Sequence, residues 1–239
     1  MMTEKVRKVV LFVELIGEPS SGKTHLACTF PKIAMFDTSP KKESWIVMRK
    51  LVKGAVERYF PIRSFGDIKT ALGEIKKKQG EFSTVVVDTS PDLRELAAKE
   101  YLGELNAKRQ AVMPPEYRHV NEKVNGMVDE ITAKMEMNLV FTSQMKDEYT
   151  PDGKAKTGRR IRKGIPDINS QADIRLFLIV NRKVDEQMKY IDEYERKCRV
   201  LKNRFRNMAE KTEWKEFLTI FTWEGIKGLT DLKEGEAVE

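Results

Sequence analysis

The feature that most constrains this chain is a glycine-rich segment, Gly17 to Thr24, which matches the pattern G-x-x-x-x-G-K-[ST]. It follows an apolar, β-branched run from Val9 to Ile16 and precedes a short helical pattern that ends before Pro31. The two glycines let the backbone turn tightly, so that successive N–H groups point at phosphate oxygens, and a helix N-terminus adds positive charge. The segment therefore predicts a strand, a phosphate-binding loop and a helix.

Two side chains of this segment have expected roles in nucleotide chemistry. Lys23 is expected to reach the β- and γ-phosphates, and Thr24 is expected to place its hydroxyl on Mg²⁺. The alternative is a glycine-rich turn without a ligand, which the flanking strand and helix disfavour. The residues expected to contact the nucleotide are Gly17, Glu18, Pro19, Ser20, Ser21, Gly22, Lys23, Thr24 and His25.

A second apolar run, from Phe82 to Thr89, carries a carboxylate near its end at Asp88, as is typical of a Walker B motif. The C-terminal ends of parallel strands converge on the ligand, so Asp88 is expected to lie beside the phosphate loop and to hold a Mg²⁺-bound water. A buried strand that ends in Asp is also typical of a turn or a helix N-cap. The loop upstream favours the metal role.

A third apolar run, from Asn138 to Gln144, ends in polar residues. If this strand is parallel to the others, Gln144 lies at the same sheet edge as Asp88. There its amide is expected to orient the attacking water or to sense the γ-phosphate. The alternative is a polar residue that simply leaves the core.

The remaining pattern predicts an α/β fold with a mostly parallel central sheet flanked by helices. Further buried strands are expected at 32–37 and 174–180, with an edge-like strand at 60–62. Apolar residues at helical spacing predict helices at 43–56, 67–78, 93–109 and 116–135. Antiparallel strands are expected towards the C-terminus, at 188–202 and 216–223.

The stretch 145–172 has little apolar periodicity and is expected to be the longest loop of the protein. Its centre is densely basic and contains glycines, so it is expected to follow a phosphodiester backbone and to become ordered on binding. Only Tyr149 lies close by as an aromatic residue, which favours phosphate contact over base contact. The alternative is a solvated loop. The residues expected to bind nucleic acid are Lys154, Lys156, Arg159, Arg160, Arg162 and Lys163.

Composition adds broader limits. The 239 residues, 40% hydrophobic and 34% charged, fit one large α/β domain over 1–232 and a flexible tail at 233–239. The net charge of +7 permits a polyanionic partner without establishing one. Cys28 and Cys198 have no Cys or His at zinc-ligand spacing and are expected to be reduced thiols. No apolar run is long enough to span a membrane, so we expect a cytoplasmic protein with no membrane partner.

The order of these motifs resembles that of the RecA-like ATPases over most of the chain. More narrowly, the chain resembles the short phage-type nucleotide-binding proteins that include the Sak-type single-strand annealing ATPases. The resembling features are GEPSSGKTHLA, the STVVVDTS strand, NLVFTSQMKDEYTPDG, the Ala172-Asp173 element and VLKNRF near the C-terminus.

The resemblance implies a RecA-like domain over 1–232 that binds ATP and Mg²⁺ and acts on single-stranded DNA in recombination or replication. It also implies a homo-oligomer, either a ring or a filament. The stretch after Gln144 corresponds by order to the DNA-binding loop of RecA-like proteins. Lys202 and Arg204 fall where related proteins place a cation that reaches the γ-phosphate of a neighbouring subunit.

One position departs from the RecA-like pattern. These enzymes usually carry a catalytic Glu just after the second strand, where this chain has Ser39. Asp37 or Glu43 is expected to polarise the attacking water instead. Hydrolysis is therefore expected to be slow, or to depend on DNA or a partner.

Two other functions use the same phosphate loop. A nucleotide or small-molecule kinase needs it too, but no compact arginine-rich lid is evident between Asp88 and Gln144. A non-hydrolysing nucleic-acid-binding protein, switched by nucleotide, is favoured by Ser39 and disfavoured by the intact Lys23, Thr24 and Asp88.

Overall fold

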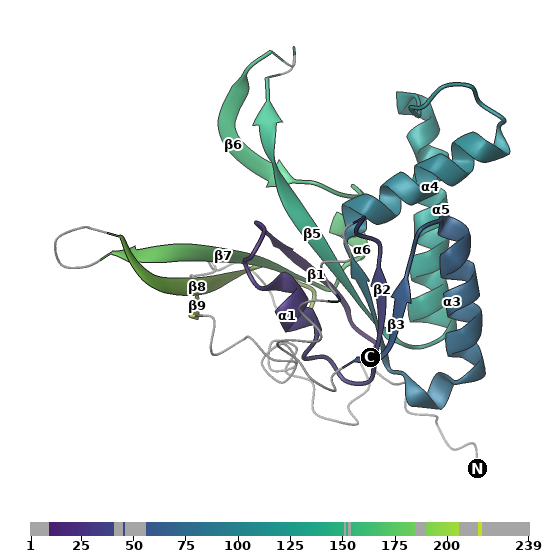
Figure 1. The fold of residues 1–239 in the computed structure, drawn as a ribbon, viewed down its shortest axis with the longest axis horizontal. Coiled ribbons are helices and arrows are strands. Elements are labelled where there is room, and N and C mark those ends of the chain that lie inside the picture. Colours follow the sequence, from purple (N-terminus) through teal and green to yellow (C-terminus); the bar gives the residue numbers. More distant parts are fainter. Residues whose placement is uncertain are drawn as a thin grey trace.

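We describe the fold from a computed structural model, which describes residues 10–40, 45, 56–150, 152, 154–184, 190–205 and 215–216. A twisted sheet forms its centre (Figure 1). Its strands are β1 (Phe12–Gly17), β2 (Ile33–Asp37), β3 (Val56–Pro61), β4 (Thr84–Asp88), β5 (Asn138–Tyr149), β6 (Lys156–Arg162), β7 (Ile174–Val184), β8 (Tyr190–Asn203) and β9 (Lys215–Glu216).

The helices among the described residues are α1 (Lys23–Ala27), α3 (Phe65–Lys77), α4 (Ser90–Glu104), α5 (Tyr117–Asp129) and α6 (Ile168–Gln171). Short 3₁₀ turns lie at Gln79–Glu81 and Pro114–Glu116, and a π-helical turn at Glu130–Lys134 extends α5. Within the described part of the chain, no helix is long and apolar enough to cross a membrane.

The strand order is β3-β2-β4-β5-β1-β7-β8-β9, and β6 pairs with β5 outside this path. Neighbours from β3 to β7 are parallel, whereas β7, β8 and β9 are antiparallel. This arrangement confirms the predicted α/β fold, with a mostly parallel sheet and antiparallel strands towards the C-terminus. It also places β5 between the strand that leads into the phosphate loop and the strand that ends in Asp88.

Both faces of the sheet are buried, which explains why its parallel strands read as continuous apolar runs. On β4, Val85 and Val87 face a core shared with α3, α4 and α5, whereas Val86 faces a second core that includes Leu26 of α1. Figure 1 shows α3, α4 and α5 gathered on one side of the sheet. Residues two apart on a strand share a face, so the alternation follows from strand geometry.

Local sequence signals fix where two of these helices begin. Ser64 accepts a hydrogen bond from the Asp67 N–H, and the Asp67 carboxylate accepts one from the Ser64 N–H, which forms a capping box for α3. Thr89, directly after β4, caps α4. Because Asp88 immediately precedes this cap, the end of β4 is held in place by the start of α4.

The prediction of a long loop at 145–172 is wrong. Strand β5 continues to Tyr149 and pairs with β6 in an antiparallel hairpin, in which Lys146 lies opposite Ile161, and α6 follows. This β5–β6 hairpin rises away from the sheet in Figure 1. Its strand β6 is exposed on both faces, so it lacks the apolar alternation that identifies a half-buried strand.

Some predictions lie outside the described residues. They are Glu43 and, apart from Trp45 and Val56, the rest of the helix expected at 43–56. The strand expected at 216–223 is described only at Glu216, which lies in β9, and the tail at 233–239 is not described. Both cysteines are free and buried, as expected for reduced thiols.

Candidate nucleotide-binding site

The phosphate loop joins β1 to α1 at the C-terminal edge of the sheet. A Cβ on Gly17 would lie 2.4 Å from the Leu178 carbonyl oxygen and 2.6 Å from Ser21 Oγ, so a side chain does not fit there. Gly22 has φ 93°, in the left-handed region that favours glycine. Both glycines of the motif are therefore required by the backbone path of the loop.

The Lys23 side chain lies inside the loop and is 7% exposed. Its Nζ donates to the carbonyl oxygens of Gly17 at 3.0 Å and Glu18 at 2.6 Å. Burial lowers the pKa of Lys23 to about 8, while the charges of Asp88 and Glu18 act to raise it. A phosphate group that entered the loop would offer this cation anionic oxygens in place of neutral carbonyls.

Thr24 and Asp88 meet beside Thr142 of β5, the strand that lies between β1 and β4. Thr24 Oγ1 donates to Asp88 Oδ2 at 2.9 Å, and the Thr142 hydroxyl donates to Asp88 Oδ1. A hydroxyl and a carboxylate side by side are the hard oxygen groups that Mg²⁺ prefers, together with phosphate oxygens and water. The residues present thus fit the predicted metal, with Thr24 as its ligand and Asp88 beside it.

Gln144 lies next to the phosphate loop. In the parallel pairing of β5 with β1, Gln144 is the partner of Gly17. Its carbonyl oxygen accepts a hydrogen bond from the Lys163 N–H at 2.7 Å, which closes the base of the hairpin. Gln144 therefore stands where the phosphate loop and the hairpin meet.

Asp37 is buried at the end of β2, opposite Asp88 in the β2–β4 register. Its Oδ1 accepts hydrogen bonds from Ser39 N at 2.9 Å and Ser39 Oγ at 2.6 Å, and its Oδ2 accepts one from the Tyr59 hydroxyl at 2.6 Å. Burial and this bond to Asp37 raise the pKa of Tyr59. Because both carboxylate oxygens are engaged, this geometry speaks against Asp37 as the catalytic base.

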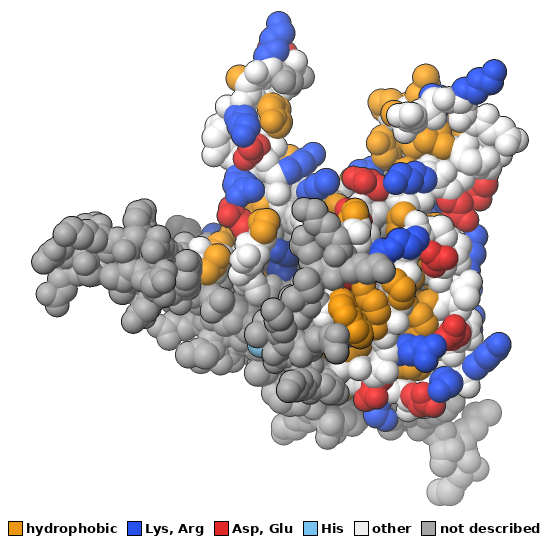
Figure 2. Space-filling view, in the orientation of Figure 1, with side chains coloured by type: hydrophobic (Ala, Val, Ile, Leu, Met, Phe, Trp, Pro, Cys, Tyr) orange, Lys and Arg blue, Asp and Glu red, His pale blue; other side chains and the backbone are white. Residues whose placement is uncertain are grey.

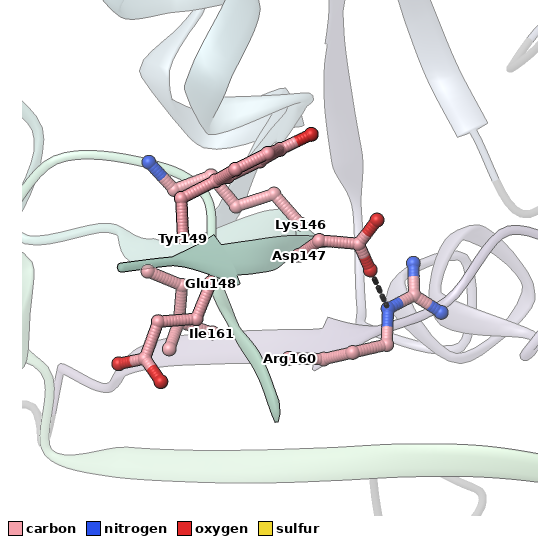
Figure 3. Close-up of a pocket in the computed structure, with 6 residues that line it drawn as sticks. All are labelled: Lys146, Asp147, Glu148, Tyr149, Arg160 and Ile161. Carbon is pink, nitrogen blue, oxygen red and sulfur yellow. Dashed lines mark ion pairs between the residues drawn. The ribbon is translucent and has the colours of Figure 1, made fainter. Parts of the chain in front are cut away.

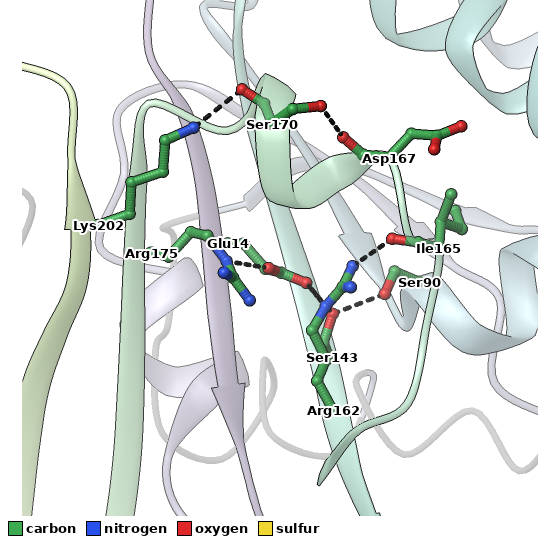
Figure 4. A network of polar contacts seen from close by, with 9 residues as sticks. All are labelled: Glu14, Ser90, Ser143, Arg162, Ile165, Asp167, Ser170, Arg175 and Lys202. Atoms are coloured by element: carbon green, nitrogen blue, oxygen red, sulfur yellow. Dashed lines mark hydrogen bonds and ion pairs between the residues drawn. The ribbon is translucent and has the colours of Figure 1, made fainter.

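An ionic cluster that the sequence patterns did not predict joins β1, β6 and β7 around Glu14 (Figure 4). Glu14 of β1 is fully buried and pairs with Arg162 of β6 and with Arg175 of β7, the latter at 2.9 Å. Ser143 Oγ also donates to Glu14, at 2.7 Å. The cluster ties the base of the hairpin and β7 to the strand that leads into the phosphate loop.

Arg162 was expected to contact nucleic acid, and the structure corrects this expectation. Its side chain is 12% exposed, pairs with Glu14 and donates to the Ile165 carbonyl oxygen at 2.7 Å. Removing it from Glu14 would leave a buried carboxylate with one partner fewer, which is costly. Arg162 therefore holds the hairpin in place.

The rest of the hairpin is exposed and basic. Between Met145 and Lys163 the chain has seven basic and three acidic residues. Lys and Arg side chains stand along this arm in Figure 2. Lys154 and Arg159 are exposed, Lys156 pairs with Asp147, and Lys163 lies 3.8 Å from Glu95.

An open pocket of about 740 Å³ lies on the hairpin (Figure 3). It is lined by Lys146, Asp147, Glu148, Tyr149, Arg160 and Ile161. Tyr149 and Ile161 are exposed apolar side chains within this charged surface. On the same strand as Ile161, Arg160 pairs with Glu18 of the phosphate loop.

A family model described as an AAA domain matches residues 11–205, which run from just before β1 to just after β8. The chain belongs to the AAA domain family. No curated protein matches it. Among solved structures, the crystal structure of the RadB recombinase is similar, with 16% identity, a TM-score of 0.47 and 87% of each chain covered.

In this AAA domain the central strands carry the phosphate loop at one end, and Lys202 and Arg204 lie near the other end of these strands. Both donate to the Ser170 carbonyl oxygen, at 2.8 and 3.1 Å, and Arg204 pairs with Asp173 at 2.8 Å. The Asp173 N–H bonds to Phe12 at the start of β1, about 17 Å from the end of that strand at the usual rise per residue. Neither cation reaches the phosphate loop of its own subunit.

In this AAA domain, Glu14 is the residue from which the ionic cluster could have been predicted. A carboxylate within the buried run Phe12 to Gly17 needs a cationic partner, since a lone buried charge is very costly. The partners could not be read from the sequence, because they lie 148 and 161 residues further along.

Proposed function

We propose that this AAA domain is an ATP-binding, Mg²⁺-dependent ATPase that acts on single-stranded DNA in recombination or replication. The observation that carries the proposal is the meeting of Lys23, Thr24 and Asp88 at one sheet edge, at the root of an exposed basic hairpin. The family match supports the nucleotide site, since it spans all three residues.

The proposed nucleotide site works through positioning and charge. Lys23 would exchange the carbonyl oxygens of Gly17 and Glu18 for β- and γ-phosphate oxygens, and loop N–H groups would hold the remaining phosphate oxygens. Thr24 and Asp88 would hold Mg²⁺ and one of its waters. Bound Mg²⁺ would neutralise charge on the terminal phosphates.

Gln144 is the proposed residue for orienting the attacking water, since it stands beside Gly17 at the loop. The carboxylate of Asp37 is engaged by Ser39 and Tyr59. With the position of the usual Glu taken by Ser39, slow turnover that DNA or a partner accelerates is the expected behaviour.

The proposed single-stranded DNA surface is the hairpin. Lys154, Lys156, Arg159 and Lys163 would contact phosphates, and each contact that displaces a counterion makes binding weaker at higher salt. The exposed ring of Tyr149 offers one base a stacking platform, which an unpaired strand can use and a duplex cannot.

Assembly into a ring or filament is part of the proposal, as is the closer relationship to Sak-type annealing ATPases. Lys202 and Arg204 stand at the sheet edge away from their own phosphate loop. In an assembly they would exchange the Ser170 carbonyl and Asp173 for the γ-phosphate of a neighbouring subunit.

The DNA proposal is tested by fluorescence anisotropy with a labelled single strand and the matching duplex, with ATPγS, ADP or no nucleotide. Tighter binding of the single strand, falling steeply with salt, is the expected result. Equal affinity for both forms, or no salt dependence, would contradict it. Phosphate transfer from ATP to a nucleoside monophosphate would instead identify a kinase.

A second candidate function is a nucleotide-switched DNA-binding protein that does not hydrolyse ATP. The hydrogen bonds from Ser39 and Tyr59 to Asp37 favour it, because they occupy the acid nearest in sequence to the expected base. Tight binding of ATP and DNA without phosphate release would select this candidate.

A further inference from the structure

Arg160 of the hairpin forms an ion pair with Glu18, the second residue of the phosphate loop. Its Nε also lies 3.7 Å from Asp147 Oδ1 across the hairpin, as Figure 3 shows. The Arg160 and Glu18 side chains are 41% and 47% exposed. The pair is thus open to solvent and accessible to a ligand that enters the loop.

The neighbouring residues explain why Arg160 stands there. Arg160 and Arg162 are two residues apart on β6 and so share one face of the strand. Arg162 is anchored to the buried Glu14 of β1, which directs this face towards the strand that leads into the loop. The placement of Arg160 over Glu18 is therefore built into the base of the hairpin.

Glu18 holds two cations in this structure. Its carbonyl oxygen accepts from Lys23 Nζ at 2.6 Å, and its carboxylate pairs with Arg160. A nucleotide phosphate competes for Lys23 at this position, and the same phosphate would offer Arg160 oxygens with more negative charge than one carboxylate.

We propose that Arg160 is a nucleotide-contacting residue that leaves Glu18 for the terminal phosphate of a nucleoside triphosphate. It would thereby distinguish a triphosphate from a diphosphate. An exposed ion pair contributes little net stability, whereas an Arg fork bound to phosphate makes strong charge-assisted hydrogen bonds. This inference rests on the proposed nucleotide site and moves Arg160 from the DNA-contacting set to the nucleotide site.

The test measures the Kd of the full chain for ATPγS and ADP, with Mg²⁺, by isothermal titration calorimetry. Arg160→Ala should weaken ATPγS binding about tenfold and ADP binding less than about twofold, since only the triphosphate carries the contacted group. Arg160→Lys should lie between, because it keeps the charge and loses the fork.

Arg58→Ala is the matched control. Arg58 forms an exposed pair with Glu74, with side chains 56% and 48% exposed, on the edge strand β3. The substitution removes the same charge and a similar ion pair, on a strand four positions away from β1 in the sheet. Both Kd values should be unchanged in this variant.

Glu18→Gln separates the exchange from general repulsion between Glu18 and phosphate. Loss of that repulsion should strengthen the binding of both ATPγS and ADP. Release of Arg160 should further strengthen the binding of ATPγS alone. In the double variant with Arg160→Ala the extra gain should disappear. The Glu18→Gln single variant also tests the inference if Arg160→Ala fails to fold.

Equal weakening of ATPγS and ADP by Arg160→Ala, or unchanged ATPγS binding, would overturn the inference, as would no extra ATPγS gain in Glu18→Gln. Failure of the nucleotide site itself has a different signature. In that case the wild-type chain binds neither nucleotide, or Lys23→Ala binds ATPγS as tightly as the wild type does.

Discussion

The Thr24 hydroxyl donates to Asp88 Oδ2 at 2.9 Å, although β5 lies between the strands that lead to these two residues. The contact is made above the sheet edge, where α1 begins and β4 ends. A loop residue and a strand residue 64 positions apart are thus brought to one point. This is the geometry expected of a metal-assisted nucleotide site.

Asp88→Asn should remove most of the Mg²⁺ dependence of ATP binding. The amide keeps a hydrogen-bonding partner for Thr24 but lacks the charge that holds a metal-bound water. Loss of such a group typically costs about 10- to 100-fold in metal affinity. Titration of ATP with Mg²⁺ and with EDTA measures the effect, and an unchanged ratio between the two conditions would contradict the role of Asp88.

ATP affinity should fall as the pH rises above about 8. Burial lowers the pKa of Lys23 to about 8 in the nucleotide-free protein, and bound phosphate favours the charged amine and raises that pKa. Binding above this pH therefore requires proton uptake, and affinity should fall by up to about tenfold per pH unit. ATP titrations between about pH 7.5 and about pH 9.5 measure it.

Lys23→Arg is the control for the pH experiment. The guanidinium of this variant stays protonated throughout this range. The ATP affinity of the variant, whatever its absolute value, should therefore not fall in the same way as the pH rises. A wild-type affinity that is flat across the range would count against Lys23 as the phosphate-binding cation.

Glu14→Gln should lower the free energy of unfolding by about 3–5 kcal/mol, because it leaves the largely buried Arg162 and Arg175 without their carboxylate. Urea denaturation measures the loss. Glu74→Gln, which breaks the exposed pair with Arg58, should cost less than about 1 kcal/mol. Equal losses of unfolding free energy in the two variants would show that the buried cluster stabilises the fold no more than an exposed ion pair does.

Lys154→Ala and Arg159→Ala should each weaken DNA binding at all sequences and reduce the salt slope by about one. Both side chains are exposed on the hairpin. Anisotropy titrations at several salt concentrations give the slope. Wild-type slopes in both variants would place the DNA site elsewhere on the chain.

The features that could be predicted from the sequence are local ones. The phosphate loop, the Asp88 strand and the Gln144 strand each have their own short pattern, and parallel strands must present their C-terminal ends at one edge. This is why residues as distant as Thr24 and Asp88 were expected together. The strand order, with β5 in the middle, was not predictable from these patterns.

The hairpin was misread because its stability does not come from an apolar face. Its strands are solvated, and its base is held by Glu14 through Arg162, a contact across 148 residues. The sequence Pro-Asp-Gly at 151–153 has the composition typical of a turn, and its position between two runs rich in charged residues was the usable sign of a hairpin. The hydrogen bond from Tyr59 to Asp37 could not be predicted for a similar reason, since Tyr59 lies on another strand.

The most direct test of the proposed function is phosphate release from Mg·ATP with and without single-stranded DNA, with Lys23→Ala as the control for contaminating ATPase. The proposal predicts release that single-stranded DNA stimulates and that the variant abolishes. Tight binding of ATP and DNA without release, or release that Lys23→Ala leaves unchanged, would contradict it.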